Sequence, residues 1–165
     1  MKINSGAEFM RKVIMFLVVA ITTIMLLVVI SLSIKKKPIS ADEFKKKLVS
    51  KGFEIEDVTK EYQYDVYDSA LKATSENINI EHYVLVSENM AIYQYDEKVD
   101  GLENIKEKST LINFSSVRGR NHDIYKLFTR EGYFMLVRVG NTILYSAGPY
   151  IYKDYAIEVF KDFGY

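Results

Sequence analysis

The sequence predicts one N-terminal transmembrane helix and one α+β domain, in which an antiparallel sheet of about five or six strands carries helices on one face. Three observations support this fold class. An uncharged apolar run covers residues 13–34. The remaining chain contains short alternating segments that are separated by tight-turn residues, as in antiparallel hairpins. Apolar residues also recur at helical spacing near both ends of the domain.

The first element is the 22-residue apolar run that begins at Val13 and ends at Ile34. A helix of this length spans about 33 Å, which exceeds the thickness of about 30 Å of a hydrocarbon core. Basic residues lie directly before and after the run, at the level of the lipid head groups. A signal peptide has a shorter apolar region of about 7–15 residues. We therefore expect an uncleaved anchor that contacts the lipid bilayer of the cell membrane through residues 13–34.

The anchor divides the chain into a polar tail at 1–12, the transmembrane helix, a basic juxtamembrane linker at 35–39 and a soluble domain at 40–165. The formal net charge is zero, but residues 1–37 hold six basic residues and one acidic residue, so the domain is acidic. Nucleic-acid binders need clustered positive charge on the folded domain. We therefore expect no nucleic-acid partner.

Two opposing features bear on the side of the membrane. Three lysines directly after the apolar run favour a cytoplasmic domain by the positive-inside rule. The short N-terminal tail also carries basic residues, however, and long domains translocate largely regardless of their charge. We expect an extracytoplasmic domain.

Helix signals follow the anchor at residues 38–52. Ser40 is the predicted N-cap, and Glu43 follows it by three residues in a capping-box pattern. Gly52 then supplies the left-handed residue that ends many helices.

The next part of the chain gives weaker signals. Residues 53–59 alternate as in a strand, whereas residues 61–79 fit both periods and are predicted as a short helix. Two strands at 81–87 and 90–95 are predicted to pair across a tight turn. A helix at 96–108 follows, and its first residue is a suitable N-cap.

The C-terminal part begins with a predicted polar loop at 110–121. Strands at 123–129, 133–139 and 142–147 follow, separated by turns that contain Gly or Asn. A final amphipathic helix begins at 148–149.

Two stretches match each other at an offset of 52 residues, namely 83–93 and 135–145. Each is predicted as a hairpin followed by a helix, which is consistent with a degenerate ββα repeat. The alternative is two unrelated hairpin–helix units, because such units resemble one another at this level of detail.

The start of the soluble domain shows a resemblance to a group of proteins. Its segments are Lys-Pro-Ile-Ser-Ala-Asp-Glu-Phe at 37–44, Lys-Gly-Phe at 51–53 and Asp-Val-Thr at 57–59. After a single N-terminal anchor, they resemble small, mostly uncharacterised membrane-anchored proteins of low-GC Gram-positive bacteria. The close resemblance covers about 20 of the 165 residues. It implies an anchored, extracytoplasmic domain and carries over no catalytic residue.

Few residues point to a metal or cofactor. The chain has no cysteine and only two histidines, His82 and His122. Asp96, Glu97 and Asp100 lie close together but lack the Gly-containing loop and terminal Glu of an EF-hand. They more simply favour the N-terminus of a helix. We expect no metal and no cofactor.

A nucleophile set could be drawn from Ser115 or Ser116 with His122 and Asp123. No nucleophile elbow is present, and adjacent residues on a strand point to opposite faces of the sheet. We expect no catalytic residue and no enzymatic activity.

Arg118, Arg120 and His122 form the candidate binding site, at the end of the predicted polar loop. A cationic loop can hold an anion or an acidic partner surface. The alternative is a solvated loop whose charges pair with nearby acidic residues. Arg138 lies within an apolar strand and is expected to be ion-paired or at a sheet edge.

All 13 tyrosines fall in the domain, where they serve as strand-favoured core residues or, alternatively, line an aromatic ligand-binding face. Together these features predict a membrane-anchored extracytoplasmic binding module without catalytic activity, whose partner is a membrane or envelope protein. Two alternatives remain, an envelope-directed hydrolase and a cytoplasmic-facing accessory subunit of a membrane complex. The sequence does not define the oligomeric state.

Overall fold

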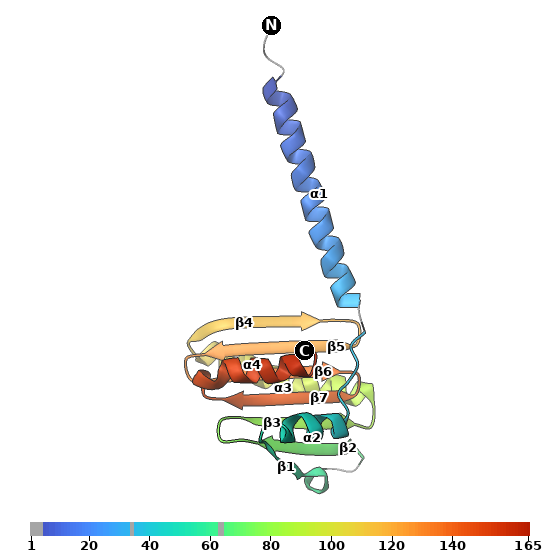
Figure 1. Ribbon diagram of the computed structural model, residues 1–165, viewed down its shortest axis with the longest axis vertical. Coiled ribbons are helices and arrows are strands. Elements are labelled where there is room, and N and C mark those ends of the chain that lie inside the picture. The colour runs from blue at the N-terminus through green and yellow to red at the C-terminus, as the bar shows by residue number, and fades with distance from the viewer. Residues whose placement is uncertain (1–4, 34, 63–64) are drawn as a thin grey trace. The chain divides into compact units, whose positions relative to one another are not determined.

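The computed structural model of the protein describes residues 5–33, 35–62 and 65–165. The start of the predicted tail, the last residue of the predicted span and two residues of the predicted short helix at 61–79 lie outside these ranges. The chain forms two compact units, Met1–Ile34 and Lys35–Tyr165, and Figure 1 shows their elements.

The first unit contains the helix α1 (Ser5–Ser33), which is 29 residues long. It begins eight residues before the predicted span, so Arg11 and Lys12 lie on the helix. Its window Phe9–Leu26 has a mean hydropathy of 2.1, and none of this window is buried within the protein. Among the described residues, α1 is therefore the helix that is long and apolar enough to span a membrane.

The second unit is built on a seven-stranded sheet, so the predicted number of five or six strands is too low. The spatial order is β1-β2-β3-β7-β6-β5-β4, and every neighbouring pair is antiparallel. Two meanders therefore meet where β3 pairs with β7. The strands are β1 (Glu54–Asp57), β2 (Tyr67–Thr74), β3 (Asn79–Leu85), β4 (Leu111–Arg118), β5 (His122–Thr129), β6 (Tyr133–Val139) and β7 (Thr142–Gly148).

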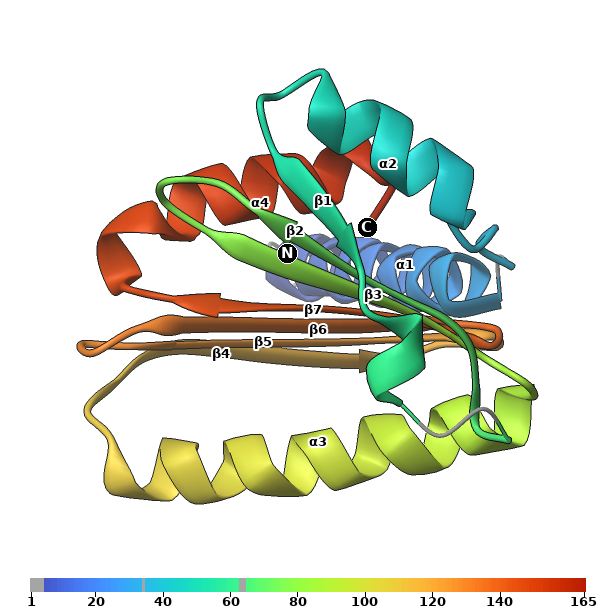
Figure 2. The ribbon, with the colours of Figure 1, turned by 90° about the horizontal axis from the view of Figure 1, so that it is seen from below.

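Helices cover both faces of this sheet, which corrects the prediction of a single helical face. Figure 2 shows α2 and α4 on one side and α3 on the other. The helical segments are α2 (Ala41–Val49), the short 3-10 turns η1 (Thr59–Glu61) and η2 (Tyr150–Tyr152), α3 (Glu88–Lys108) and α4 (Lys153–Asp162). The domain is thus an α+β sandwich of three layers.

The central strand β6 explains why both faces are covered. Met135 and Val137 belong to the core that includes the buried residues of α2 and α4, whereas Leu136 belongs to the core beneath α3. Successive side chains of a strand point to opposite faces, and all three of these side chains are almost completely buried. An apolar surface on each face needs its own helical layer, because each fully buried aliphatic side chain contributes about 1.5–3 kcal/mol relative to an exposed one.

The helix α3 corrects two predictions at once. The predicted strand at 90–95 belongs to this helix, which begins where the Ser87 Oγ accepts a hydrogen bond from the Met90 amide at 3.2 Å. Ala91 and Tyr95 lie four residues apart and are both buried. Residues at this spacing share one face of a helix, so the segment packs against the sheet as a helix. The matching stretch at 135–145 is the β6–β7 hairpin, and the two stretches are therefore not equivalent ββα units.

The segments 61–79 and 110–121, predicted as a short helix and a loop, each contain a strand. Residues 61–79 contain β2, whose Ala70 and Leu71 are buried in opposite cores, so the segment has no clear period of two. The predicted loop at 110–121 contains β4, which is mostly exposed because it lies at the sheet edge. The strands predicted between residues 123 and 147 are confirmed as β5, β6 and β7.

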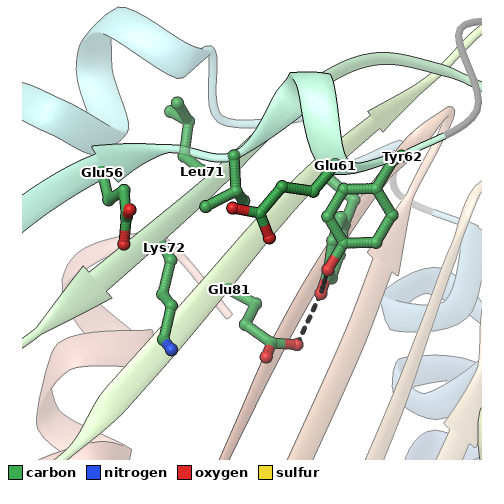
Figure 3. Close-up of a pocket in the computed structure, with 8 residues that line it drawn as sticks. Glu56, Glu61, Tyr62, Leu71, Lys72 and Glu81 are labelled. Atoms are coloured by element: carbon green, nitrogen blue, oxygen red, sulfur yellow. Dashed lines mark hydrogen bonds between the residues drawn. The ribbon is translucent and has the colours of Figure 1, made fainter.

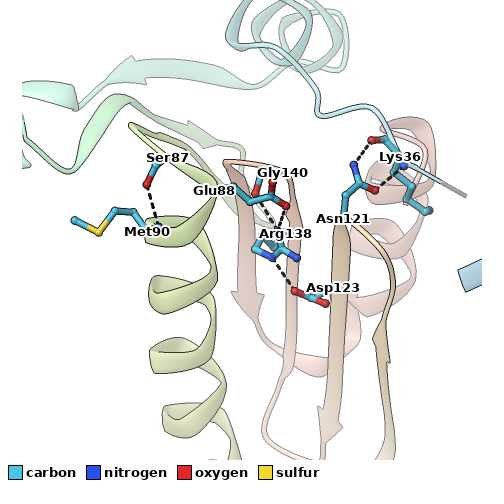
Figure 4. A network of polar contacts seen from close by, with 8 residues as sticks. All are labelled: Lys36, Ser87, Glu88, Met90, Asn121, Asp123, Arg138 and Gly140. Atoms are coloured by element: carbon cyan, nitrogen blue, oxygen red, sulfur yellow. Dashed lines mark hydrogen bonds and ion pairs between the residues drawn. The ribbon is translucent and has the colours of Figure 1, made fainter. Parts of the chain in front are cut away.

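The segment directly after residue 34 belongs to the domain. The side chain of Asn121 accepts a hydrogen bond from the Lys36 amide at 2.9 Å and donates one to the Lys36 carbonyl at 2.8 Å (Figure 4). The hydroxyl of Tyr165 accepts from the Ile39 amide at 3.0 Å and donates to the Lys37 carbonyl at 3.1 Å. These contacts join residues 36–39 to the β4–β5 turn and to the last residue of the sequence.

Arg138 is buried near the C-terminal end of β6, and the prediction that it is ion-paired is confirmed. Its Nε donates to Asp123 Oδ2 at 2.7 Å, and its Nη1 donates to Glu88 Oε1 at 3.2 Å and to the Gly140 carbonyl at 3.0 Å (Figure 4). The side chains of Arg138 and Asp123 are 5% and 7% exposed. Arg138 therefore has partners on β5, on α3 and in the β6–β7 turn.

We expect the Asp123→Asn variant to lower the free energy of unfolding of the domain Lys35–Tyr165 by about 3 kcal/mol, because it leaves a buried guanidinium without its main counter-charge. Urea unfolding followed by circular dichroism measures this loss. Asp96→Asn is the control, since its ion pair with Arg118 is largely exposed and is worth about 0–1 kcal/mol. Equal losses in the two variants would contradict the prediction.

Candidate binding site

The structure separates the three residues of the predicted cationic site. Arg118 ends β4, and its Nη2 lies 2.6 Å from Asp96 Oδ1 of α3. Arg120 is exposed in the turn that follows. His122 begins β5 and is only 3% exposed. Arg118 pairs across the strands with Asp123, so it lies on the α3 face, whereas His122 points to the opposite face.

The imidazole of His122 packs tightly against the β4–β5 turn. A Cβ atom added to Gly119 would lie 2.2 Å from the His122 ring, so only glycine fits there. Burial lowers the pKa of His122, and the ammonium of Lys36 lowers it further. The ring is therefore neutral at pH 7 and adds no positive charge to the turn.

The other residues considered in the sequence are also dispersed. Ser115 and Ser116 are exposed on β4, while His122 and Asp123 point to opposite faces of the sheet, as predicted for strand neighbours. The described part of the chain contains no group of three His, Cys, Asp or Glu side chains that could hold a metal ion. The candidate nucleophile set of Ser115 or Ser116 with His122 and Asp123 is thus divided between the two faces of the sheet.

A pocket of about 230 Å³ lies at the other end of the sheet, over β1, β2 and β3. Figure 3 shows the side chains around it. Three carboxylates, one ammonium and two phenol rings line it together with aliphatic side chains. The lining residues are Glu56, Val58, Glu61, Tyr62, Leu71, Lys72, Glu81 and Tyr83.

A second pocket of about 310 Å³ adjoins the first and shares Tyr62 and Tyr83 with it. Tyr67 completes a cluster of three rings, and the centroid of its ring lies 4.9 Å from Tyr62 and 5.7 Å from Tyr83. From α3, Glu97 and Lys98 line this second pocket. We call the two pockets together the tyrosine pocket.

A short hydrogen-bond chain fixes the rings of this pocket. The Tyr83 hydroxyl donates to Glu81 Oε2 at 2.7 Å, and the hydroxyl oxygens of Tyr62 and Tyr83 lie 3.1 Å apart (Figure 3). Since Tyr83 uses its proton for Glu81, Tyr62 is the donor of the second bond. Burial and these bonds raise the pKa of Tyr83, which therefore stays neutral over the physiological range.

The charges around the tyrosine pocket are unbalanced. Four glutamates line it, at positions 56, 61, 81 and 97, against two lysines, at 72 and 98. Within the described residues none of these glutamates forms an ion pair. The Lys98 ammonium lies 5.5 Å from the centroid of Tyr83 and 4.8 Å from that of Tyr145, so the rings already attract a cation.

Sequence reasoning missed this site for a structural reason. The sequence predicts an aromatic ligand-binding face only as an alternative for the tyrosines as a class, without positions. Tyr67 and Tyr83 meet because β2 pairs with β3, and Tyr62 joins them from the end of η1. The sequence instead predicts a short helix at 61–79. The available signal was the alternation of Tyr62 with Tyr64 and Val66, which also fits an extended segment.

The comparisons with known proteins add little to this geometry. No family model matches the sequence, and no curated protein is significantly similar to it. A crystal structure of a GTP binding regulator from Thermotoga maritima is similar at 13% identity and a TM-score of 0.40, over 69% of this chain and 79% of that chain. A similarity this weak carries no inference about function. The chain is thus defined by its own features, as an α+β protein with an apolar N-terminal helix.

We expect the free energy of unfolding of the domain to fall as the pH decreases below about 6.5, the ordinary pKa of histidine. Burial lowers the pKa of His82 and His122 in the folded state, so the unfolded state takes up these protons first. Each histidine contributes up to about 1.4 kcal/mol per pH unit between its unfolded and folded pKa values. Urea unfolding at pH 7, 6 and 5 measures this slope.

The His82→Gln and His122→Gln variants provide the control for this slope, because each removes one titrating ring and leaves the carboxylates in place. We expect a shallower pH dependence in each variant. Slopes identical to that of the unmodified domain would show that the histidines do not cause the effect.

Proposed function

We propose that this chain is a single-pass membrane protein whose domain lies on the extracytoplasmic side and binds a partner protein without catalysis. The tyrosine pocket is the contact site, and it receives a cationic side chain of a membrane or envelope protein. One observation carries this proposal, namely the four glutamates without ion pairs beside a cluster of three tyrosine rings.

The chemistry of the pocket favours a cation over other ligands. A cation over an aromatic face gains about 0.5–1 kcal/mol when exposed and about 2 kcal/mol when desolvated. A hydrogen bond to a carboxylate contributes about 1.5–3 kcal/mol. Glu61 and Glu81 offer such acceptors beside the ring of Tyr62 (Figure 3). An anion at this position would face four negative charges.

The tyrosine pocket has room for a side chain. Its two parts measure about 230 and 310 Å³. A lysine or arginine side chain fits this space, and the helix α1 supports a partner in the same membrane or envelope.

A photo-reactive amino acid placed in the pocket tests the binding proposal in intact cells. We expect the full chain with a benzoylphenylalanine at Lys72, which lines the pocket, to cross-link to a discrete partner. The same group at Lys161, which is exposed on α4, is expected to give no such product. Cross-linked products are detected by gel electrophoresis and mass spectrometry.

Charge variants decide whether the cross-link depends on the pocket. Glu61→Gln and Glu81→Gln are expected to reduce the product about tenfold, because each removes a carboxylate worth at least about 1.4 kcal/mol to the cation. Glu131→Gln, at an exposed turn outside the pocket, is the matched control. Arg120→Ala examines the predicted cationic turn in the same assay. A product that survives both pocket variants would refute the cation-binding role.

Reporter fusions test the topology. An enzyme that is active only outside the cell, fused after Tyr165, is expected to give a signal, whereas a protein that fluoresces only inside is expected to give none. A fluorescent internal fusion would contradict the extracytoplasmic placement. It would then favour an accessory subunit of a membrane complex that faces the cytoplasm.

A further inference from the structure

The two edges of the sheet are protected to different extents. The edge strand β1 has four residues, and three of them are acidic. The opposite edge strand β4 has eight residues, and its only charge is Arg118 at the end. Among the described residues no strand pairs with the outer side of β4. Long edge strands without charges or prolines are open to pairing with another strand.

The backbone of β4 shows which groups are free for pairing. The Gly119 amide donates to the His122 carbonyl at 2.7 Å, and residues of an antiparallel pair alternate between bonding inward and outward. In this register Ser115 and Val117 bond to β5, while the N–H and C=O groups of Phe114 and Ser116 point away from it. The Phe114 N–H donates to Asn113 Oδ1 at 2.7 Å and exchanges this bond for an inter-strand one on pairing. A row of outward backbone groups therefore follows the edge.

The side chains of β4 add an apolar surface to this edge. Leu111, Ile112 and Val117 are 48%, 46% and 38% exposed. A pocket of about 380 Å³ lies beside the start of the strand, between the sheet and the α4 layer. Its lining combines the apolar side chains of Ile112, Phe128, Tyr150 and Ile157 with Asn113, Lys153 and Asp154. Recognition by strand addition combines backbone hydrogen bonds with such a side-chain pocket.

We propose that β4 pairs antiparallel with β4 of a second copy of this chain, about a two-fold axis between the two Ser115 residues. The two sheets then form one continuous sheet across the dimer. This register places Ser116 opposite Phe114 of the second copy, so the outward backbone groups face one another.

The register also explains the exposed Val117. It places Val117 of the second copy beside Asn113, at the mouth of the pocket between the sheet and the α4 layer. Side chains at 113, 115 and 117 share the face of the sheet that α4 covers, since Val117 pairs with Ile124 of that core. By symmetry each copy buries its own Val117 against the pocket of the other copy.

Charge and location favour a second copy as the occupant. Pairing of β4 with itself places no like charges directly opposite each other, whereas pairing of β1 with itself would oppose acidic residues. If α1 lies in a membrane, it confines all copies to one surface, which raises the effective concentration for a weak edge contact.

Single cysteines test this interface in the full chain in its membrane, because the natural sequence contains no cysteine. Two Ser115 residues at the axis would form a pair without backbone hydrogen bonds, with Cα atoms about 4.5 Å apart, which suits a disulfide. We expect Ser115→Cys to give a disulfide-linked dimer on mild oxidation, at least about fivefold above the controls. The controls are Ser116→Cys, whose side chain points to the other face, and Glu54→Cys on β1.

A second variant separates edge pairing from chance encounters. Val117→Lys, in the Ser115→Cys background, is expected to reduce the dimer to the control level, because an ammonium replaces the apolar contact of Val117 with the pocket beside Ile112. Val49→Lys on α2, another exposed valine, is expected to leave the dimer unchanged. Equal yields for Ser115→Cys and either control, or a dimer that persists with Val117→Lys, would overturn the proposal.

Discussion

The domain depends on burial of both faces of its central strands. In β6, Met135 and Leu136 are adjacent in the chain and both are fully buried, but they belong to different cores. A strand in this environment needs a layer of helices on each side. The chain supplies α2 and α4 for one face and the long helix α3 for the other (Figure 2). The positions of these three helices follow from this requirement.

Several polar groups inside the layers bond to groups on other elements, and these bonds connect the layers. Arg138 bonds to Asp123 across the sheet and to Glu88 at the start of α3. On the other face, His82 Nε2 lies 3.0 Å from the Ile39 carbonyl, so β3 holds the segment that leads into the domain. Tyr165 bonds to the same segment. A buried polar group that loses its partner costs about 1–3 kcal/mol of stability. These bonds therefore favour the one packing of the layers in which the partners meet.

The two edges of the sheet have different chemistry, and each carries one proposed interaction. At the β1 edge, acidic side chains and tyrosines surround a pocket that suits a cationic group. At the β4 edge, uncharged residues leave backbone groups and apolar side chains open to a second copy. Neither site was defined by the sequence, because Tyr62 and Tyr83 are 21 residues apart and β4 had the composition of a loop.

The sequence alone determined the features that depend on local chemistry. These are the apolar helix α1, the Ser40 cap and Gly52 end of α2, and the strands β5 to β7 with their turns. Tertiary structure decided the features for which local periods compete or disappear. Residues 90–95 became helical because Ala91 and Tyr95 pack on the sheet, and β4 became a strand by pairing with β5. The reason is that an edge strand or a doubly covered strand lacks the alternation that marks a strand with one buried face.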